Sequence, residues 1–339
     1  MLQKIEILGV KIPMYSLMIV VGVIAYLLWL YLGVIRKERL DRKNGVSLLV
    51  TSVFGLAVLY ACSLVIDSIF MSIQKGRFSF GSITWLGGFI GALPVTIFLI
   101  HMLVPCDKGR ALNRFSTLMP GFILAHAFGR VGCFFAGCCH GAPTDSFLGV
   151  VFPGHTPAGN LYPDYNSNDY LISSSNKIFF PSVPVLPTQL IEACFELLLV
   201  IIMIALYKRL KNYNIELYCI AYGIFRFTLE FFRGDTRGET GFFLTPSQLM
   251  SIIIWAYAVI IILYRKGILF KRVRSKCRVW AENADRQVLE SKEARRLEVI
   301  RVLDGLKRDG LITEGEFEAK KAQILNIKAP DFEDEGTTE

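Results

Sequence analysis

Seven apolar segments recur along the first 264 residues, and polar or basic stretches separate them. Each segment has about 17 to 25 residues, which is the length that an α-helix needs to cross the hydrocarbon core of a bilayer. The segments cover residues 14–35, 46–70, 83–104, 115–136, 188–207, 216–232 and 246–264. The pattern predicts an all-α polytopic membrane protein with seven transmembrane helices.

The composition agrees with this pattern up to residue 264 and then changes. Of the 339 residues, 53% are hydrophobic and 19% are charged, and the mean hydropathy is +0.45. Residues 265–339 hold 17 of the 37 lysines and arginines and 15 of the 29 acidic residues. The chain before residue 265 is therefore too apolar for a soluble enzyme, a secreted disulfide domain or a disordered chain. The remainder is a separate, solvated region.

Basic residues in the predicted loops set the expected orientation. The first apolar segment runs directly into Arg36-Lys37-Glu38-Arg39, which indicates a membrane anchor and not a cleaved signal peptide. Lysines and arginines concentrate in the loops after the first, third and fifth segments. By the positive-inside rule we expect the N-terminus outside and the C-terminus inside. The net charge of +8 lies mostly beside membrane segments, so it does not indicate a nucleic-acid partner.

The longest predicted outer connection, residues 137–187, is rich in Asn, Ser, Tyr and Pro and carries one lysine. An extended outer loop above a helical bundle is where a substrate from the outer leaflet would be handled. The composition fits a plain spacer equally well.

Two arginines, Arg130 and Arg226, lie inside apolar segments. An ionisable group at membrane depth costs several kcal/mol unless it is paired or hydrated, so both are candidate functional residues. A structural salt bridge within the bundle is the alternative. His126 lies four residues before Arg130 and therefore on the same helical face.

Arg226 lies within a longer polar face formed by Tyr222, Arg226, Glu230 and Arg233, which are spaced 4, 4 and 3 residues apart. Arg226 and Glu230 can pair, and Arg233 can share the carboxylate at the outer end. Two guanidinium groups converging near the outer surface would form a bidentate clamp for a phosphate, and a lipid supplies that anion at this depth. Two acidic residues in the fifth segment would offset the arginines or bind a cation: Glu192 and Glu196.

Cys133, Cys138, Cys139 and His140 cluster where the fourth segment ends. A disulfide from Cys133 to Cys138 or Cys139 would suit an oxidising outer face. A metal site is a second interpretation, because Cys and His are zinc ligands, although the spacing is not a standard one. Small polar packing or a reactive thiol is a third, and the sequence leaves all three open.

Five segments together resemble the prolipoprotein diacylglyceryl transferase family. Residues 129–137, Gly-Arg-Val-Gly-Cys-Phe-Phe-Ala-Gly, are similar to its signature Gly-Arg-x-Gly-Asn-Phe-x-Asn-Gly. Residues 222–233 resemble its Tyr-x-x-x-Arg-x-x-x-Glu-Phe-x-Arg segment. Residues 187–192, Pro-Thr-Gln-Leu-Ile-Glu, are similar to Pro-[Ser/Thr]-Gln-Leu-Tyr-Glu. Residues 87–91 resemble Gly-Gly-x-x-Gly, and residues 247–249 resemble a Gly-Gln-x element. The resemblance covers roughly residues 10–264.

The resemblance implies a multi-pass enzyme of the bacterial cytoplasmic membrane that needs no cofactor. Such an enzyme moves a diacylglyceryl group from phosphatidylglycerol to the lipobox cysteine of a preprolipoprotein, recognised through its signal peptide. We expect catalytic roles for Arg130, Arg226, His126, Tyr222 and Glu230. The residues expected to bind substrate are Arg130, Arg226, Arg233, Tyr15, Gly132, Gly141 and Gln189.

The chain departs from the family pattern at several positions. Leu86 occupies the place of the histidine that precedes Gly-Gly in the third segment, and Cys133 and Ala136 replace the two signature asparagines. Cys138 replaces the following glutamate. The stretch Gly-Cys-Cys-His-Gly at 137–141 resembles a divergent branch that carries Gly-Cys-Cys-x-Gly. His126 is a candidate replacement for the missing base.

The polar region after residue 264 divides into three predicted parts: a charged linker at 265–298, a helix pair at 299–326 and an acidic disordered tail at 327–339. Gly310 should end the first helix, and Thr313 with Glu316 forms a capping box for the second. The pair resembles the small module known as SHOCT. So small a unit buries little core, so we expect it to bind a protein partner or to self-associate. A solvated tail is the alternative.

Three other functions compete with diacylglyceryl transfer to a lipoprotein. The departures from the family pattern would suit a related lipid transferase with a different acceptor. They would also suit a catalytically altered membrane scaffold whose C-terminal region recruits a partner. A transporter is disfavoured, because residues 1–264 show no internal repeat and no matching pair of Gly/Pro-broken segments.

Overall fold

The computed structural model describes residues 4–7, 10–81, 83–172, 177–234 and 243–325. The chain divides into two compact units, residues 1–277 and 278–339. The long helices of the first unit are α1 (Met14–Leu28), α2 (Arg42–Lys75), α3 (Trp85–Leu103), α4 (Ala111–Ala136), α6 (Thr188–Ala205), α8 (Asn214–Leu229) and α9 (Pro246–Arg265). Each overlaps one of the seven predicted segments, although α1 ends seven residues before the predicted end at 35 and α2 ends five residues after the predicted end at 70.

Short elements join these helices. The helical ones are the π-helix η1 (Trp29–Arg36), which continues α1, the 3₁₀ turns η2 (Pro105–Asp107) and η3 (Glu230–Phe232), and the helices α5 (Pro157–Leu161) and α7 (Tyr207–Leu210). Two antiparallel strand pairs complete the unit, β1 (Lys4–Ile7) with β2 (Val10–Pro13) and β3 (Leu171–Ile172) with β4 (Ile178–Phe179).

Six of the described helices are long and apolar enough to cross a membrane. They are Met14–Arg36, Arg42–Lys75, Trp85–Leu103, Ala111–Ala136, Thr188–Ala205 and Pro246–Arg265. The remaining predicted segment, 216–232, forms α8, which has 16 residues and is continued by η3. The structure therefore supports a mostly helical, polytopic membrane protein, and α8 by itself is shorter than each of these six spans.

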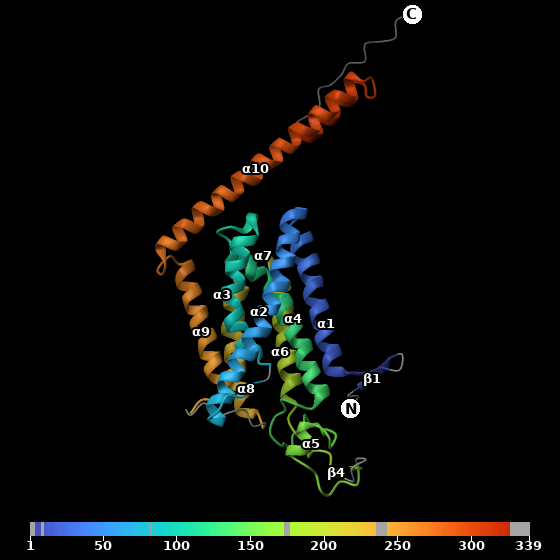
Figure 1. Ribbon diagram of the computed structural model, residues 1–339, viewed down its shortest axis with the longest axis vertical. Helices are drawn as coiled ribbons and strands as arrows, with labels where there is room; N and C mark the ends of the chain where they lie inside the picture. Colours follow the sequence, from blue (N-terminus) through green and yellow to red (C-terminus); the bar gives the residue numbers. More distant parts are fainter. Residues whose placement is uncertain (1–3, 8–9, 82, 173–176, 235–242, 326–339) are drawn as a thin grey trace, which may run out of the picture. The chain divides into compact units, whose positions relative to one another are not determined.

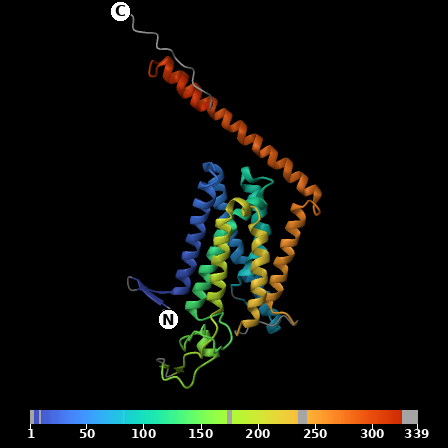
Figure 2. The same cartoon turned by 180° about the vertical axis from the view of Figure 1, so that it is seen from behind.

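Helix α4 lies at the centre of the bundle. It packs against α1, α3, α6 and α8, while α2 packs against α3 and α8 against α9. Figure 2 shows α1, α4, α6, α8 and α9 side by side. Small residues allow the closest approaches, as is usual between membrane helices. A Cβ atom at Gly22 of α1 would lie 2.8 Å from the Ala125 carbonyl oxygen of α4.

The sequence marks the ends of the helices by local capping. Thr245 and Gln248 form a reciprocal capping box at the start of α9, followed by Pro246 at its first position. Helix α4 ends at Gly137, whose φ of +67° is a backbone conformation that favours glycine. These caps place the polar loops where the membrane helices stop.

The loops separate into two sets at opposite ends of the bundle (Figure 1). The β1–β2 hairpin and the segment with α5 and β4 lie at one end, which we call the hairpin end. The η1–α2 turn and α7 lie at the other, which we call the basic end because Arg36, Lys37, Lys208 and Arg209 belong to its loops.

The second unit contains α11 (Glu314–Leu325) and most of α10 (Lys271–Arg308), so one helix continues through the predicted linker and through the boundary predicted at 298/299. Gly310 follows α10 with a φ of +70°. Thr313 and Glu316 form the predicted reciprocal hydrogen bonds at the start of α11. Leu303 and Phe317 are buried. The predicted tail at 327–339 lies outside the described residues.

Candidate active site

Two arginines from different helices converge on one buried carboxylate. Arg130 of α4 places Nη2 3.0 Å from Glu192 Oε1 of α6, and Arg226 of α8 places Nε 3.9 Å from the same oxygen. Glu192 is fully buried, and the two arginines are 8% and 1% exposed. The sequence analysis considered convergence of the two arginines on a shared phosphate, and the structure places the Glu192 carboxylate between them.

Neighbouring side chains complete this network. Arg226 pairs with Glu230, with 2.6 Å between Nη1 and Oε2, as the i,i+4 spacing predicted. The Arg226 Nη2 also donates to the Ser247 hydroxyl at 2.8 Å. Tyr222 donates its hydroxyl hydrogen to Glu192 Oε1 at 2.7 Å. Glu192 and Glu230 therefore balance the two guanidinium charges, and the buried ions are paired as the low dielectric requires.

His126 joins this network through a second glutamate. Its Nδ1 contacts Glu196 Oε1. The His126 imidazole stacks on Trp85, with ring centroids 4.1 Å apart and planes inclined by 5°. One ligand atom each from His126, Glu192 and Glu196 lie within 4.8 Å of one another. His126 therefore lies next to Glu192, the carboxylate that contacts both arginines.

Several buried polar atoms of this network have no hydrogen-bond partner within the described part of the chain. They include Arg130 Nε, His126 Nε2, Glu192 Oε2 and Gln189 Oε1. A buried donor without a partner costs about 1–3 kcal/mol, so such atoms mark places where a ligand or water is expected. The network therefore offers a guanidinium donor and an imidazole nitrogen to a bound molecule.

The predicted substrate-binding residues lie at the hairpin end of α4 and in the loops beside it. Gly132 lets Tyr15 approach α4, because a Cβ atom there would lie 3.2 Å from the Tyr15 ring. Gly141 forms an antiparallel bridge with Arg233. Gln189 donates its side-chain amide hydrogen to the Cys138 carbonyl at 2.6 Å. These contacts attach the loop after α4 to the start of α6 and to the end of α8.

The three cysteines of the predicted cluster converge, and the histidine does not join them. The Sγ atoms of Cys133, Cys138 and Cys139 all lie within 4.8 Å of one another. All eight cysteines lie in the described residues, and none forms a disulfide in the structure. The buried His140 places Nδ1 3.0 Å from the Gly141 carbonyl oxygen. The described residues therefore supply three thiol ligands and leave His140 outside the set.

The group of His126, Glu192 and Glu196 also has the spacing of a cation site. Glu192 already faces two arginines and Glu196 already contacts His126. The positive charge of the arginines repels a metal ion, and one oxygen of each carboxylate is already occupied by these neighbours. The group therefore fits proton transfer and anion binding better than metal binding.

Sequence reasoning expected Glu192 and Glu196 to offset the arginines or to bind a cation, and it gave no site role to Trp85 or Ser247. The signal for the glutamates was present, because both lie four residues apart in an otherwise apolar helix. Nothing local marks Trp85, since its ring reaches His126 from another helix. Leu86, which replaces the family histidine, is buried and packs into the hydrophobic core.

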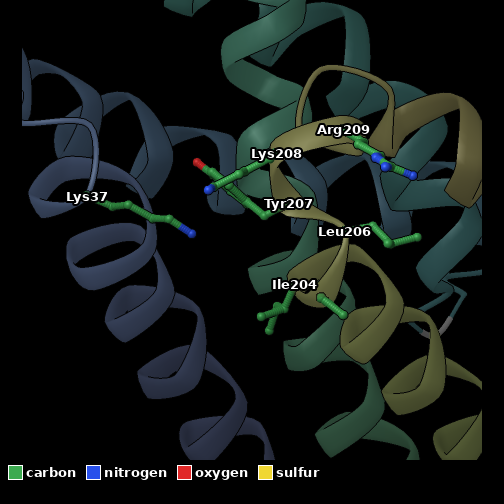
Figure 3. Close-up of a pocket in the computed structure, with 7 residues that line it drawn as sticks. Lys37, Ile204, Leu206, Tyr207, Lys208 and Arg209 are labelled. Atoms are coloured by element: carbon green, nitrogen blue, oxygen red, sulfur yellow. The ribbon is translucent and has the colours of Figure 1, made fainter.

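A separate cavity of about 460 Å³ lies at the basic end, between η1 and α7. Lys37 and residues 204–209 line it (Figure 3). The Lys37 ammonium lies 3.5 Å from the centre of the Tyr207 ring. None of the arginine network lines this cavity, so it is not the candidate active site.

Comparison with known proteins gives one consistent result. The family model described as prolipoprotein diacylglyceryl transferase matches residues 3–264. The chain is 32% identical over 262 residues to the phosphatidylglycerol–prolipoprotein diacylglyceryl transferase 2 of Clostridium perfringens, covering 74% of this chain and 89% of that relative. It is 27% identical over 281 residues to the enzyme of that name from Clostridium tetani, covering 77% and 97%. The chain therefore belongs to the prolipoprotein diacylglyceryl transferase family.

Proposed function

We propose that this protein transfers a diacylglyceryl group from phosphatidylglycerol to the cysteine thiol of a lipoprotein precursor. The relatives named above carry this activity in their names, and the family match covers all the membrane helices. The chain is accordingly a transferase of lipoprotein maturation. The observation that carries the site assignment is the convergence of Arg130 and Arg226 on Glu192, with the buried Arg130 Nε available to a ligand.

The reaction forms a carbon–sulfur bond and breaks a carbon–oxygen bond. The thiolate attacks the glyceryl carbon that carries the phosphate, and glycerol phosphate leaves with the bonding electrons. Negative charge therefore grows on the phosphate oxygen. We assign Arg130 and Arg226 to bind that phosphate, because guanidinium donors aimed at the leaving group stabilise the transition state more than the ground state. Glu192 and Glu230 hold the two donors in position.

We assign His126 as the base that removes the thiol proton. We place the ring proton of neutral His126 on Nδ1, which faces Glu196 Oε1, so that Nε2 is the acceptor of the thiol proton and the carboxylate stabilises the imidazolium that forms. Trp85 fixes the plane of the ring by stacking. This arrangement would supply from α4 the histidine that the family pattern has at the position of Leu86.

We further propose seven spans, with the N-terminus outside and the protein in the bacterial cytoplasmic membrane. Successive long helices run in opposite directions through the bundle (Figure 1), and the basic end holds the lysines and arginines of the loops after the first, third and fifth predicted segments. The hairpin end would then face outward, where precursor and lipid arrive. On this view α8 crosses the membrane together with η3.

The C-terminal helices form a SHOCT-like module in this proposal. The capped start of α11 and the buried Phe317 support a specific fold for the helix pair. We propose that the module binds a protein partner or a second copy. The Gly-Cys-Cys-His-Gly stretch likewise supports placing the chain in a divergent branch of the family.

The test of the site is transfer in vesicles with labelled phosphatidylglycerol and a lipobox peptide. Arg130→Ala and Arg226→Ala should each lower formation of the thioether-linked lipid by about 10²–10³-fold or more. Arg114→Ala is the matched control, since Arg114 is also 8% exposed but pairs with Glu38 and Asp107 at the basic end. Arg114→Ala should keep the transfer rate of the unmutated protein when the rate is expressed per folded molecule. An arginine variant of the site with full activity would exclude the clamp.

The same assay separates the competing functions. Release of glycerol phosphate only with a non-peptide acceptor would indicate a related transferase. Phosphatidylglycerol binding without turnover, beside an active relative as positive control, would indicate a scaffold.

A further inference from the structure

The proposed transfer reaction leaves three cysteines at the end of α4 without a role. Cys133 lies in the last turn of α4, and Cys138 and Cys139 follow the helix. The backbone turns back at this point, because Gly137 and Cys139 both have positive φ, +67° and +60°. For a residue other than glycine this conformation carries a cost. The double turn folds two thiols back over the third.

The resulting geometry matches one coordination sphere. The three Sγ atoms lie within 4.8 Å of one another. Thiolates on a single metal ion at about 2.3 Å would stand about 3.8–4.0 Å apart, so small side-chain rotations close the difference. A disulfide would use two of the sulfurs and exclude the third. Convergence of all three therefore favours a metal ion over a disulfide.

We propose that Cys133, Cys138 and Cys139 bind one thiophilic metal ion with a filled d shell, Cu(I) or Zn²⁺, as a structural site. Three sulfur ligands suit a soft ion, and water would complete the sphere of zinc. Each ligating thiol releases its proton to solvent. His140 is not included among the ligands, because the group of ligand atoms that lie within 4.8 Å of one another contains the three cysteines without it.

The ion would hold the loop after α4 in place. The Cys138 carbonyl accepts from Gln189 at 2.6 Å, and the Cys139 carbonyl accepts from Thr188 at 2.8 Å. The metal would thus tie the end of α4, which carries Arg130, to the start of α6, which carries Glu192. The metal site would stabilise the relative positions of α4 and α6, which hold the arginine network, and would take no part in the transfer of the lipid.

The test measures metal content of the full chain, independently of transferase activity. The protein in detergent is first reduced and stripped of metal with a chelator. It is then incubated with either Zn²⁺ or Cu(I), the latter kept reduced by ascorbate, and desalted into buffer that contains a weak competing chelator. Mass spectrometry of the eluted metal should give one ion per chain for at least one of the two. Cys139→Ser should lower retention by more than the roughly 10–100-fold that loss of an outer-shell partner costs. Cys194→Ser is the control, because that cysteine is exposed in α6, and should retain the metal.

Alkylation of the unmutated protein tests the site without any variant. Bound metal should protect Cys133, Cys138 and Cys139 together, mapped by peptide mass spectrometry, and leave Cys194 reactive. Metal loading should also raise the thermal midpoint by several degrees. Two results would overturn the proposal. One is retention of neither ion, and the other is a quantitative disulfide within the cluster in protein isolated from membranes without reductant.

Discussion

At the residue scale the site is held together by one carboxylate. Glu192 Oε1 accepts from Tyr222 and lies 3.0 and 3.9 Å from the guanidinium nitrogens of Arg130 and Arg226. A buried ion pair contributes little net stability, but removal of one partner leaves an uncompensated charge and costs about 3–5 kcal/mol. Glu192 therefore fixes the direction of both arginines, and it contributes more to their positioning than to the stability of the fold.

The His126–Glu196 pair gives a prediction at this scale. Glu196→Gln keeps the size of the side chain and removes its charge, so the imidazolium loses its stabilising partner. We expect kcat to fall by about 10²–10⁴-fold. The KM for phosphatidylglycerol should change little, because Glu192 and the arginines stay in place. Steady-state kinetics in mixed micelles measures both constants.

Glu216→Gln is the matched control for that experiment. Glu216 is also a buried glutamate, and it pairs with Arg265 at the start of α8, away from the site. Its loss should lower thermal stability and leave kcat unchanged. An unchanged kcat in Glu196→Gln would remove Glu196 from the mechanism.

At the element scale the contact of α1 with α4 depends on a missing side chain. Gly22→Ala would place Cβ 2.8 Å from the Ala125 carbonyl oxygen, which is backbone and cannot rotate away. We expect a loss of about 1–3 kcal/mol, seen as a lower thermal midpoint in detergent. Gly129→Ala on α4 is the control, because nothing lies within 4 Å of its added Cβ. Equal midpoints for both variants would contradict the close packing.

The turn between η1 and α2 is tied to α4 by an ionic contact that predicts a pH effect. Burial opposes ionisation of Glu38, but the Arg114 guanidinium outweighs it and holds the pKa of Glu38 below its usual range. A carboxyl whose pKa is lower in the folded state stabilises the fold above its unfolded pKa. That stabilisation is lost as the pH falls through the folded pKa.

Comparison of the unmutated protein with Glu38→Gln tests this. The difference in thermal midpoint should be largest at neutral pH and should close as the pH falls through the lowered pKa of folded Glu38, where its carboxyl becomes neutral like the amide. Asp107 also contacts Arg114, and burial together with the Glu38 charge raises the pKa of Asp107, so the difference between the two proteins includes this coupling. A difference that does not depend on pH would show that Glu38 acts by packing alone.

At the scale of the whole molecule we expect the first unit to carry out the transfer reaction without the second. The family match ends at residue 264, and the first compact unit ends at Cys277. A chain that ends at residue 277 should keep the specific activity of the full chain in the vesicle assay. Phe317→Asp in the full chain is the companion variant, because it breaks the α10–α11 contact in place without shortening the protein. Loss of transfer in both would show that the module is needed for catalysis.

The sequence by itself determined the apolar helices, the caps between the two C-terminal helices and which ionisable side chains of the apolar segments are candidates for burial. The length and hydropathy of a segment decide by themselves whether it can cross a membrane as a helix. Residues four apart share a helical face whatever the helix packs against. Arg226 with Glu230 was predictable for that reason, and Thr313 with Glu316 was predictable because a capping box depends on residues close together in the sequence. The close approach of Arg226 to Arg130 was expected only as a consequence of a shared ligand.

Only the tertiary structure decided which faces meet. Glu192 lies between two arginines, and Trp85 covers His126, because the rotation and register of α3, α4, α6 and α8 are set by packing across the bundle. The convergence of Cys139 on Cys133 depends on a reversal of the backbone at two positive φ angles, one of them at a residue other than glycine. Contacts between helices depend on shape complementarity over many side chains, which no local pattern records.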